Sequence, residues 1–194
     1  MTATAARSAA TYDDLVRAGD DGIAEIILGE LITTPRPSGP HAIASSALAA
    51  DLHSFYQRGR GGGPGGWWIV YEPELHLDGH VLVPDLAGWR KERLPAYPRG
   101  AGVAVPPDWV CEVLSDSTRA IDRVRKLPLY ASLQVAFAWL VDPIARTLEV
   151  FAQHHGRWTL LSSHEGDAQV RAEPFAHVAI ALSPLWDLGE TATP

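Results

Sequence analysis

Short apolar runs separated by turn residues dominate the hydrophobic pattern of the chain, and this pattern indicates several buried strands. The run 24–32 predicts a hairpin that turns near Gly29, with β-branched residues on both arms. A second hairpin is predicted from strands 67–77 and 81–89, joined at Asp78-Gly79, which is a strong signal for a tight turn. The remaining predicted strands are 109–114, 137–141, 148–151 and 158–161.

Three stretches carry the spacing or the end signals of helices. Thr11 and Asp14 form a capping-box pattern that opens a short helix ending near Ala18. Apolar residues recur at helical spacing through 40–55, with a proline in the first turn, and predict an amphipathic helix. The segment 115–132 starts with several N-cap residues and predicts the third helix.

One domain accounts for all of these elements. No internal repeat is visible, and the mixture of strands and helices indicates an α/β domain with a mixed β-sheet core flanked by helices. We expect this domain to span 11–188, with a disordered tail at 1–10 and a second tail at 189–194. The Gly-rich segment 58–66 lacks the Gly-Lys-Ser/Thr ending of a nucleotide-phosphate loop and is expected to be a connector.

Composition narrows the class of protein. A chain of 194 residues with 46% hydrophobic and 20% charged residues is typical of one packed domain. The formal charge of −7 argues against a generic basic nucleic-acid coat. Cys111 is the single cysteine, which excludes an internal disulfide and a thiolate zinc site. No apolar stretch reaches the roughly 18 residues of a membrane helix and no secretory signal is visible, so a cytoplasmic protein without membrane contact is expected.

Two predicted strands each hold a carboxylate within an apolar run. Asp85 follows Val-Pro in the run 81–86, and Glu112 lies in the middle of the run 109–114. Burying an ionised carboxylate among valines and leucines costs several kcal/mol unless hydrogen bonds or a cation compensate it. Asp85 alone could be an ordinary turn or cap residue, but a mid-strand Glu112 has no such role. Together they predict two acids that converge on one cation.

Oxygen ligands without a nearby thiolate favour a hard ion, so Mg²⁺ or Mn²⁺ is the expected metal. A metal held by two carboxylates can orient a water, lower its pKa and neutralise charge on a phosphoryl oxygen. Phosphodiester hydrolysis therefore fits best. The cation beside the nucleophile is expected to be Lys126, on the helix that follows the Glu112 strand.

The helical wheel of 115–132 leaves the direction of Lys126 open. If this polar side lines a cleft, Lys126 reaches the site, and otherwise it is a solvated surface residue. The wheel predicts a buried stripe of Ile121, Val124, Pro128 and Ala131, opposite a polar side of Arg119, Asp122, Arg123, Lys126 and Tyr130.

Over roughly residues 12 to 187, the chain resembles the Uma2-like family, a domain of unknown function within the PD-(D/E)XK restriction-endonuclease-like superfamily. The resemblance implies a restriction-endonuclease-like core with extra N-terminal and C-terminal hairpins, in which Asp85 and Glu112 bind Mg²⁺. Its motifs, in order along the chain, are Gly29-Glu30-Leu31, His41, Val83-Pro84-Asp85, Glu112-Val113-Leu114-Ser115, Ser117-Thr118, Asp122-Arg123, Lys126-Leu127-Pro128-Leu129-Tyr130 and Trp139-Leu140-Val141-Asp142-Pro143.

The chain departs from the superfamily signature at one position. The signature places Lys two residues after the second acid, where this chain has Leu114, and the family pattern suggests Lys126 as the replacement. Glu30 matches the family's Glu and is a candidate third acid, although a Glu next to a turn is usually just exposed. The remaining candidates are His41, Arg119 and Arg123, as weak nucleic-acid contacts.

Two functions remain open on the sequence alone. The leading hypothesis is an endonuclease that hydrolyses DNA, with catalytic Asp85, Glu112, Lys126 and Glu30, and superfamily habit suggests a homodimer. The alternative is a catalytically inactive nuclease-fold module that binds nucleic acid or a protein partner, which the acidic net charge and Leu114 favour. An α/β hydrolase is excluded for want of a Gly-x-Ser-x-Gly elbow.

Overall fold

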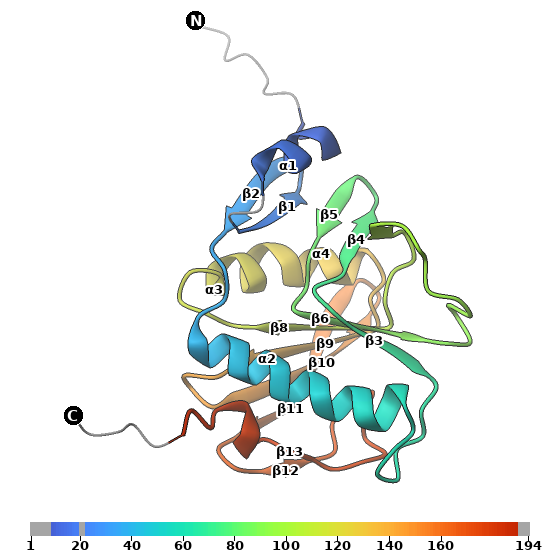
Figure 1. The fold of residues 1–194 in the computed structure, drawn as a ribbon, viewed down its shortest axis with the longest axis vertical. Coiled ribbons are helices and arrows are strands. Elements are labelled where there is room, and N and C mark those ends of the chain that lie inside the picture. The colour runs from blue at the N-terminus through green and yellow to red at the C-terminus, as the bar shows by residue number, and fades with distance from the viewer. Residues whose placement is uncertain (1–8, 20–21, 190–194) are drawn as a thin grey trace, which may run out of the picture.

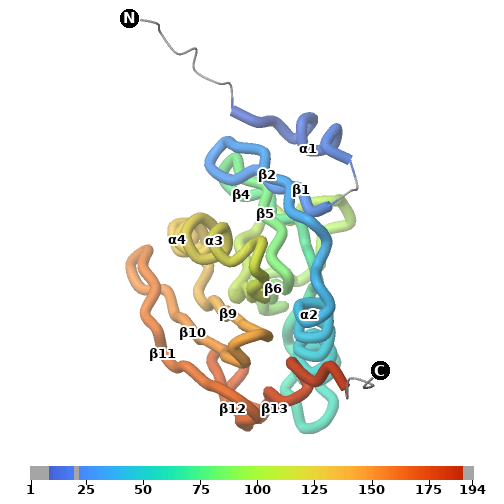
Figure 2. The backbone as a smooth tube through the Cα atoms, turned by 90° about the vertical axis from the view of Figure 1, so that its left-hand side faces the viewer, coloured from blue at the N-terminus to red at the C-terminus, as the bar shows by residue number. Residues whose placement is uncertain are grey.

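A computed structural model describes residues 9–19 and 22–189 and shows an α/β fold built around a six-stranded sheet. Helix α2 (Gly39–Leu52) covers one face of this sheet, and the helical segment labelled α3 and α4 lies over the other (Figures 1 and 2). The predicted mixed sheet flanked by helices is therefore confirmed. The predicted tails fall largely on 1–8 and 190–194, which lie outside the described residues.

The six-stranded sheet is antiparallel except for one parallel pair, β8 with β9. Every residue of β8 is buried, as expected for a central strand. The strands, in their spatial order, are β11 (Arg157–Glu165), β10 (Thr147–His154), β9 (Phe137–Asp142), β8 (Trp109–Val113), β6 (Leu86–Arg90) and β3 (Trp67–Tyr71).

A second, five-stranded sheet contains the N-terminal hairpin, and helix α1 (Tyr12–Ala18) lies beside it. The predicted capping box of α1 is present between Thr11 and Asp14. A small C-terminal hairpin, β12 (Gln169–Val170) with β13 (Ile180–Ala181), closes the far end of the molecule (Figure 1). The five strands, in spatial order, are β2 (Glu30–Thr34), β1 (Ile23–Ile27), β5 (His80–Leu82), β4 (Glu74–Leu77) and β7 (Gly102–Val103).

The two strands predicted around the Asp78-Gly79 turn are each divided in two. The turn itself is correct, with φ of 48° and 78° at its central residues. The first strand breaks after Tyr71, where Glu72 has a φ of 43°, and the second breaks at 83–85 around Pro84. In both strands the piece next to the turn belongs to the five-stranded sheet and the other piece to the six-stranded sheet. Asp85 consequently lies where the chain crosses between sheets.

Strand β11 is also longer than the predicted 158–161. Its pairing with β10 shifts register between Val150 and Phe151, and Leu160 and Leu161 are both exposed beside this bulge. A bulge interrupts the two-residue alternation on which the sequence pattern depends. The strand therefore could not be recognised at its full length from hydrophobicity.

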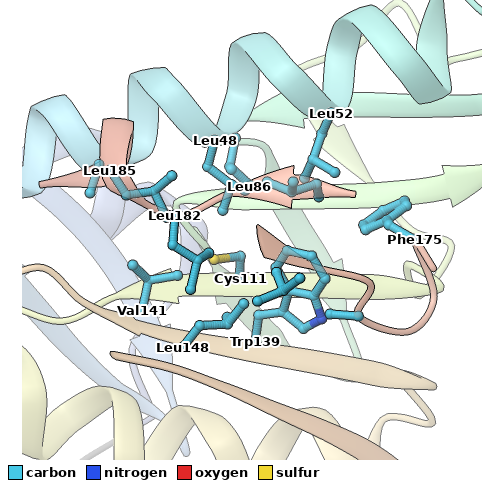
Figure 3. Packing of buried hydrophobic residues seen from close by; sticks show 14 of the residues in the cluster. Leu48, Leu52, Leu86, Cys111, Trp139, Val141, Leu148, Phe175, Leu182 and Leu185 are labelled. Atoms are coloured by element: carbon cyan, nitrogen blue, oxygen red, sulfur yellow. The ribbon is translucent and has the colours of Figure 1, made fainter. Parts of the chain in front are cut away.

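Two apolar cores lie on the two faces of the six-stranded sheet. On the α2 side, Leu48 and Leu52 pack over Cys111 and Trp139, with Phe175 at the edge of the group (Figure 3). On the other side, Val110 belongs to the cluster that contains residues of α4. Because side chains alternate along β8, Glu112 shares the face of Val110 and points toward the helix that carries Lys126.

The helix at 119–132 buries the polar side of the wheel, whose direction the sequence left open. It consists of α3 (Arg119–Ile121), a π-helical segment at Asp122–Lys126 and α4 (Leu127–Ser132). Val124 is 72% exposed and Pro128 is also exposed, so the predicted buried stripe is wrong at both positions. Lys126 and Tyr130 are buried instead, because ion pairs and hydrogen bonds replace the apolar contacts that a wheel counts.

Within the described ranges, no helix combines the length and the apolar character that a membrane crossing requires.

The exposed position of Val124 can be tested with a matched pair of substitutions. Val124→Ala should leave the free energy of unfolding unchanged within about 0.5 kcal/mol, since an exposed valine buries little surface. Val150→Ala, at a fully buried position of β10, should lower it by about 1.5–3 kcal/mol through lost burial and a cavity. Urea unfolding measures both, and a comparable loss in the two variants would contradict the observed orientation of the helix.

Candidate active site

A cavity of about 310 Å³ lies between the first turn of α2, the N-terminal hairpin and the start of the helix at 119–132. Five carboxylates line it, of which Asp116 is exposed and the other four belong to residues that are at most 8% exposed. The four buried ones are Glu25 from β1, Asp85 from the sheet crossing, Glu112 from β8 and Asp122 from the π-helical segment. The cavity therefore gathers negative charge from four separate parts of the chain.

Asp85 is fixed by two donors from different layers. Its Oδ2 accepts the backbone N–H of Val113 at 2.6 Å, and its Oδ1 lies 3.0 Å from Nε2 of His41 on α2. In β6 and β8, Leu86 pairs with Cys111, so the next pair in this register is Asp85 with Glu112. The two predicted acids thus lie side by side where the strands end.

Lys126 points into the cavity, which decides the question that the helical wheel left open. Its Nζ lies 2.9 Å from Oε1 of Glu112, and Tyr130 donates its hydroxyl to the same oxygen at 2.6 Å. The side chain of Lys126 is only 4% exposed. Lys126 therefore stands beside the second acid, whereas Leu114, at the signature position, is fully buried.

Glu25 is the third acid of the site, and the sequence interpretation missed it. Its Oε1 accepts the backbone N–H of Val83 at 2.7 Å and lies 3.1 Å from Nζ of Lys126. Glu30, the predicted third acid, does not line the cavity, because its exposed side chain pairs with Arg125 at 2.6 Å. Glu25 interrupts the apolar run 24–27 as Glu112 interrupts its own run, so the same signal could have found it.

Asp122 was also missed as a site residue. Its Oδ1 lies 3.9 Å from Nζ of Lys126, four residues further along the helix. The π-helical segment has i→i+5 hydrogen bonds and a wider turn than an α-helix, which keeps residues spaced by four close to one face. Asp122, Lys126 and Tyr130 follow this spacing and are all buried.

The four carboxylates outnumber the two basic groups in contact with them. Burial raises the pKa of Glu112 well above its usual range, Lys126 offsets this only in part, and Asp122, Asp85 and Glu25 raise it further. Burial likewise raises the pKa of Asp122 to about 6, against the opposing charge of Lys126. The excess negative charge therefore favours binding of a proton or a cation.

The pKa values of the two buried basic groups, Lys126 and His41, are also raised, but by the charge of the carboxylates and against the effect of burial. Burial acts to lower the pKa of Lys126, but the charges of Glu112 and Glu25 outweigh it and hold the pKa well above its ordinary value. Burial also acts to lower the pKa of His41, yet the hydrogen bond and the charge of Asp85 leave it raised. Lys126 is consequently a permanently charged ammonium in this site.

Comparison with known proteins assigns the chain to a family. A family model described as "Putative restriction endonuclease", Uma2, matches residues 9–184. The protein belongs to the Uma2 family. No curated protein gives a significant match.

A solved structure shares the fold. It is described as a "putative nuclease belonging to DUF820" from Anabaena variabilis ATCC 29413, and it superposes with a TM-score of 0.71 at 22% sequence identity. The match covers 92% of this chain and 98% of the other. The predicted membership of the family and the nuclease-like fold are both confirmed.

The donor atoms of this Uma2 protein suit a hard cation held by few protein ligands. Within the described part of the chain, no group of three or more His, Cys, Asp or Glu side chains is arranged to hold a metal. Mg²⁺ is commonly bound through one or two carboxylates, with waters and substrate phosphates completing the shell. Asp85 and Glu112 supply two carboxylates, and Lys126 and Tyr130 both contact Oε1 of Glu112.

The three weak nucleic-acid contacts predicted for this Uma2 protein lie in different settings. His41 is 5% exposed and belongs to the site through Asp85. Arg119 pairs with Asp142, and Arg123 pairs with Glu149 at 2.6 Å, so both are drawn toward the sheet and neither lines the cavity. Contact of any of the three with nucleic acid stays a prediction.

The pKa of Asp122 generates a test by pH. A pKa near 6, raised from 3.8, means that the folded state binds this proton more tightly than the unfolded state, so stability is lost as pH rises from about 4 to about 6. Asp122→Asn mimics the protonated form at every pH. Its melting temperature relative to wild type should rise across this window and level off near pH 7. There the difference in the free energy of unfolding between variant and wild type approaches about 3 kcal/mol. A difference between the two proteins that is constant from pH 4 to 8 would contradict this assignment.

Proposed function

We propose that the protein is an endonuclease that hydrolyses phosphodiester bonds of DNA with the help of Mg²⁺ or Mn²⁺. The observation that carries the proposal is the position of the Lys126 ammonium, 2.9 Å from Glu112 in a cavity that Asp85 also lines. Two carboxylates and a lysine at one cavity are the groups that metal-assisted phosphodiester hydrolysis requires. The match to the Uma2 family, described as "Putative restriction endonuclease", supports a nucleic acid as substrate.

Asp85 and Glu112 would hold the metal, each in a distinct way. Asp85 is already oriented by Val113 and His41, so little side-chain freedom is lost when an ion binds. Glu112 would bind the ion through Oε2, since Lys126 and Tyr130 both contact Oε1. When bound, the ion supplies a water of lowered pKa and neutralises charge on the phosphoryl oxygen.

Lys126 contributes a fixed positive charge at the cavity wall. Because its pKa is raised by Glu112 and Glu25, it keeps its protons and is no general base. A charge placed before the reaction stabilises negative charge that develops on the phosphoryl group, without a reorganisation step. In the resting site the same charge balances part of the surrounding carboxylate excess.

The mouth of the cavity suits a phosphate-bearing strand. The hydroxyls of Ser115, Ser117 and Thr118 line the cavity next to the buried acids, and Arg36 lines it from the segment that follows β2. Hydroxyls and arginine are frequent partners of backbone phosphates. They would orient the strand, while the metal offsets the repulsion between phosphate and the acids.

One of the two observations that favoured a catalytically inactive module no longer supports it. Leu114 suggested a missing catalytic lysine, but Lys126 occupies the neighbourhood of Glu112 from another element. The net charge of −7 remains its other support, and the bound cation of the proposed enzyme offsets that charge locally. A homodimer, which would place two sites on the two DNA strands, stays a prediction.

Substitution of the two acids tests the proposal. Asp85→Asn and Glu112→Gln preserve size and hydrogen-bond acceptors, so the fold should persist while the metal is lost. We expect the rate of Mg²⁺-dependent cleavage of plasmid DNA to fall by more than roughly 10- to 100-fold, which is the loss typical of a residue that contacts a metal ligand but not the metal. Calorimetric titration of the wild type with Mg²⁺ or Mn²⁺ should show binding in the millimolar range or tighter, weakened in both variants.

The matched control is Glu30→Gln, which removes an exposed carboxylate outside the cavity and should leave cleavage and metal binding unchanged. Cleavage retained by Asp85→Asn would refute the assignment. An absence of any metal binding by the wild type would favour the inactive module.

A further inference from the structure

We propose that Glu25 is a positioning residue that fixes the Lys126 ammonium and the Asp85 segment relative to each other. The inference rests on the proposed function, since it concerns the geometry of that same site. Glu25 comes from the N-terminal hairpin, outside the six-stranded sheet that carries Asp85 and Glu112 near its strand ends. The hairpin would then complete the catalytic site, in addition to extending the fold.

One oxygen of Glu25 joins two parts of the site. Oε1 accepts the Val83 N–H at 2.7 Å, two residues before Asp85, and also lies 3.1 Å from Nζ of Lys126. Lys126 in turn donates to the carbonyl oxygen of Val83 at 3.0 Å. The three groups form a closed triangle, so a movement of the lysine is coupled to the backbone that presents Asp85.

The ammonium has no spare donor in this arrangement. A lysine carries three N–H donors, and here Glu25, Glu112 and the Val83 carbonyl supply three acceptors within 3.1 Å. Asp122, at 3.9 Å, is a fourth acceptor that is not in direct contact. Without the charge of Glu25, the ammonium would be drawn toward Asp122 and away from its place between the two glutamates.

The sheet holds Glu25 in position for this role. Strand β1 pairs with β5 through Ile26 and Val81, which brings Glu25 close to the chain that leaves β5 at Val83. The Glu25 side chain is 4% exposed, so its carboxylate has little contact with solvent and relies on Val83 and Lys126 as partners. An unpaired carboxylate there would be strongly unfavourable, and its retention is explained by the clamp on Lys126.

Lysine NMR tests the clamp without reference to activity. The sequence contains two lysines, Lys126 and Lys91, so selective ¹³C-lysine labelling gives two sets of side-chain signals. In Glu25→Gln, which keeps the size of the side chain, the Lys126 ε-signal should shift while that of Lys91 stays in place. The matched control Glu30→Gln, in the same hairpin but outside the cavity, should move neither signal.

Kinetics test the consequence for the reaction. In Glu25→Gln, kcat for DNA cleavage should fall by about 10- to 100-fold, the size expected from loss of a charge-assisted hydrogen bond, with KM for DNA unchanged. The Kd for Mg²⁺ should stay within about twofold, because Glu25 acts through Lys126 and does not hold the metal. Added to Lys126→Met, the substitution should lower kcat no further than about twofold.

Each outcome decides the inference. An unchanged Lys126 signal, an unchanged kcat, or effects of Glu25→Gln and Lys126→Met that multiply would overturn it. A tenfold or larger rise in the Mg²⁺ Kd would make Glu25 a metal ligand and also overturn the inference.

If Glu25→Gln fails to fold, a second variant keeps the inference testable. Glu25→Asp shortens the side chain by one methylene, so it should shift the Lys126 signal and lower kcat in the same sense. If the wild type cleaves no DNA, the proposed function fails, while the NMR comparison still decides whether Glu25 holds Lys126.

Discussion

The Lys126 ammonium, shared by Glu25 and Glu112, is the interaction on which the arrangement of the site depends. It joins a strand of each sheet to the helix at 119–132, and all three side chains are only about 4% exposed. A buried charge is tolerated when its partners satisfy every donor, and here each ammonium N–H has an acceptor. The helix therefore docks with its polar side inward and leaves Val124 in solvent.

The two sheet crossings create the space that this ion pair occupies. Breaks after Tyr71 and around Pro84 turn two long strands away from the six-stranded sheet and into the second one. Asp85 lines the cavity at the opening between the sheets, and His41 of α2 contacts Asp85 there. Apolar cores pack on both faces of the main sheet and support these walls, and Figure 3 shows the core on the α2 side. Rigid surroundings of this kind allow like charges to be kept close together.

Most elements could be predicted from local signals, and the failures have identifiable causes. The capping box of α1, the turns at Gly29 and Asp78-Gly79, and the central strand β8 were all recognised. The wheel of 119–132 predicted a buried apolar stripe that is wrong at Val124 and Pro128, because the helix buries an ion-pair network on its polar side instead. Glu30 was chosen as the third acid through family resemblance and Glu25 was not considered, although a carboxylate inside an apolar run was the better physical signal.

The sequence by itself determined the family through its motifs, and it determined the α/β class and the two acids within apolar runs because apolar periodicity and the placement of charges are local properties of the chain. Only the tertiary structure decided that Lys126 faces these acids and that Glu25 and Asp122 join them. Those positions depend on how strands 58 residues apart, such as those near Glu25 and Val83, are brought together. Long-range packing sets that distance, and no local pattern along the chain encodes it.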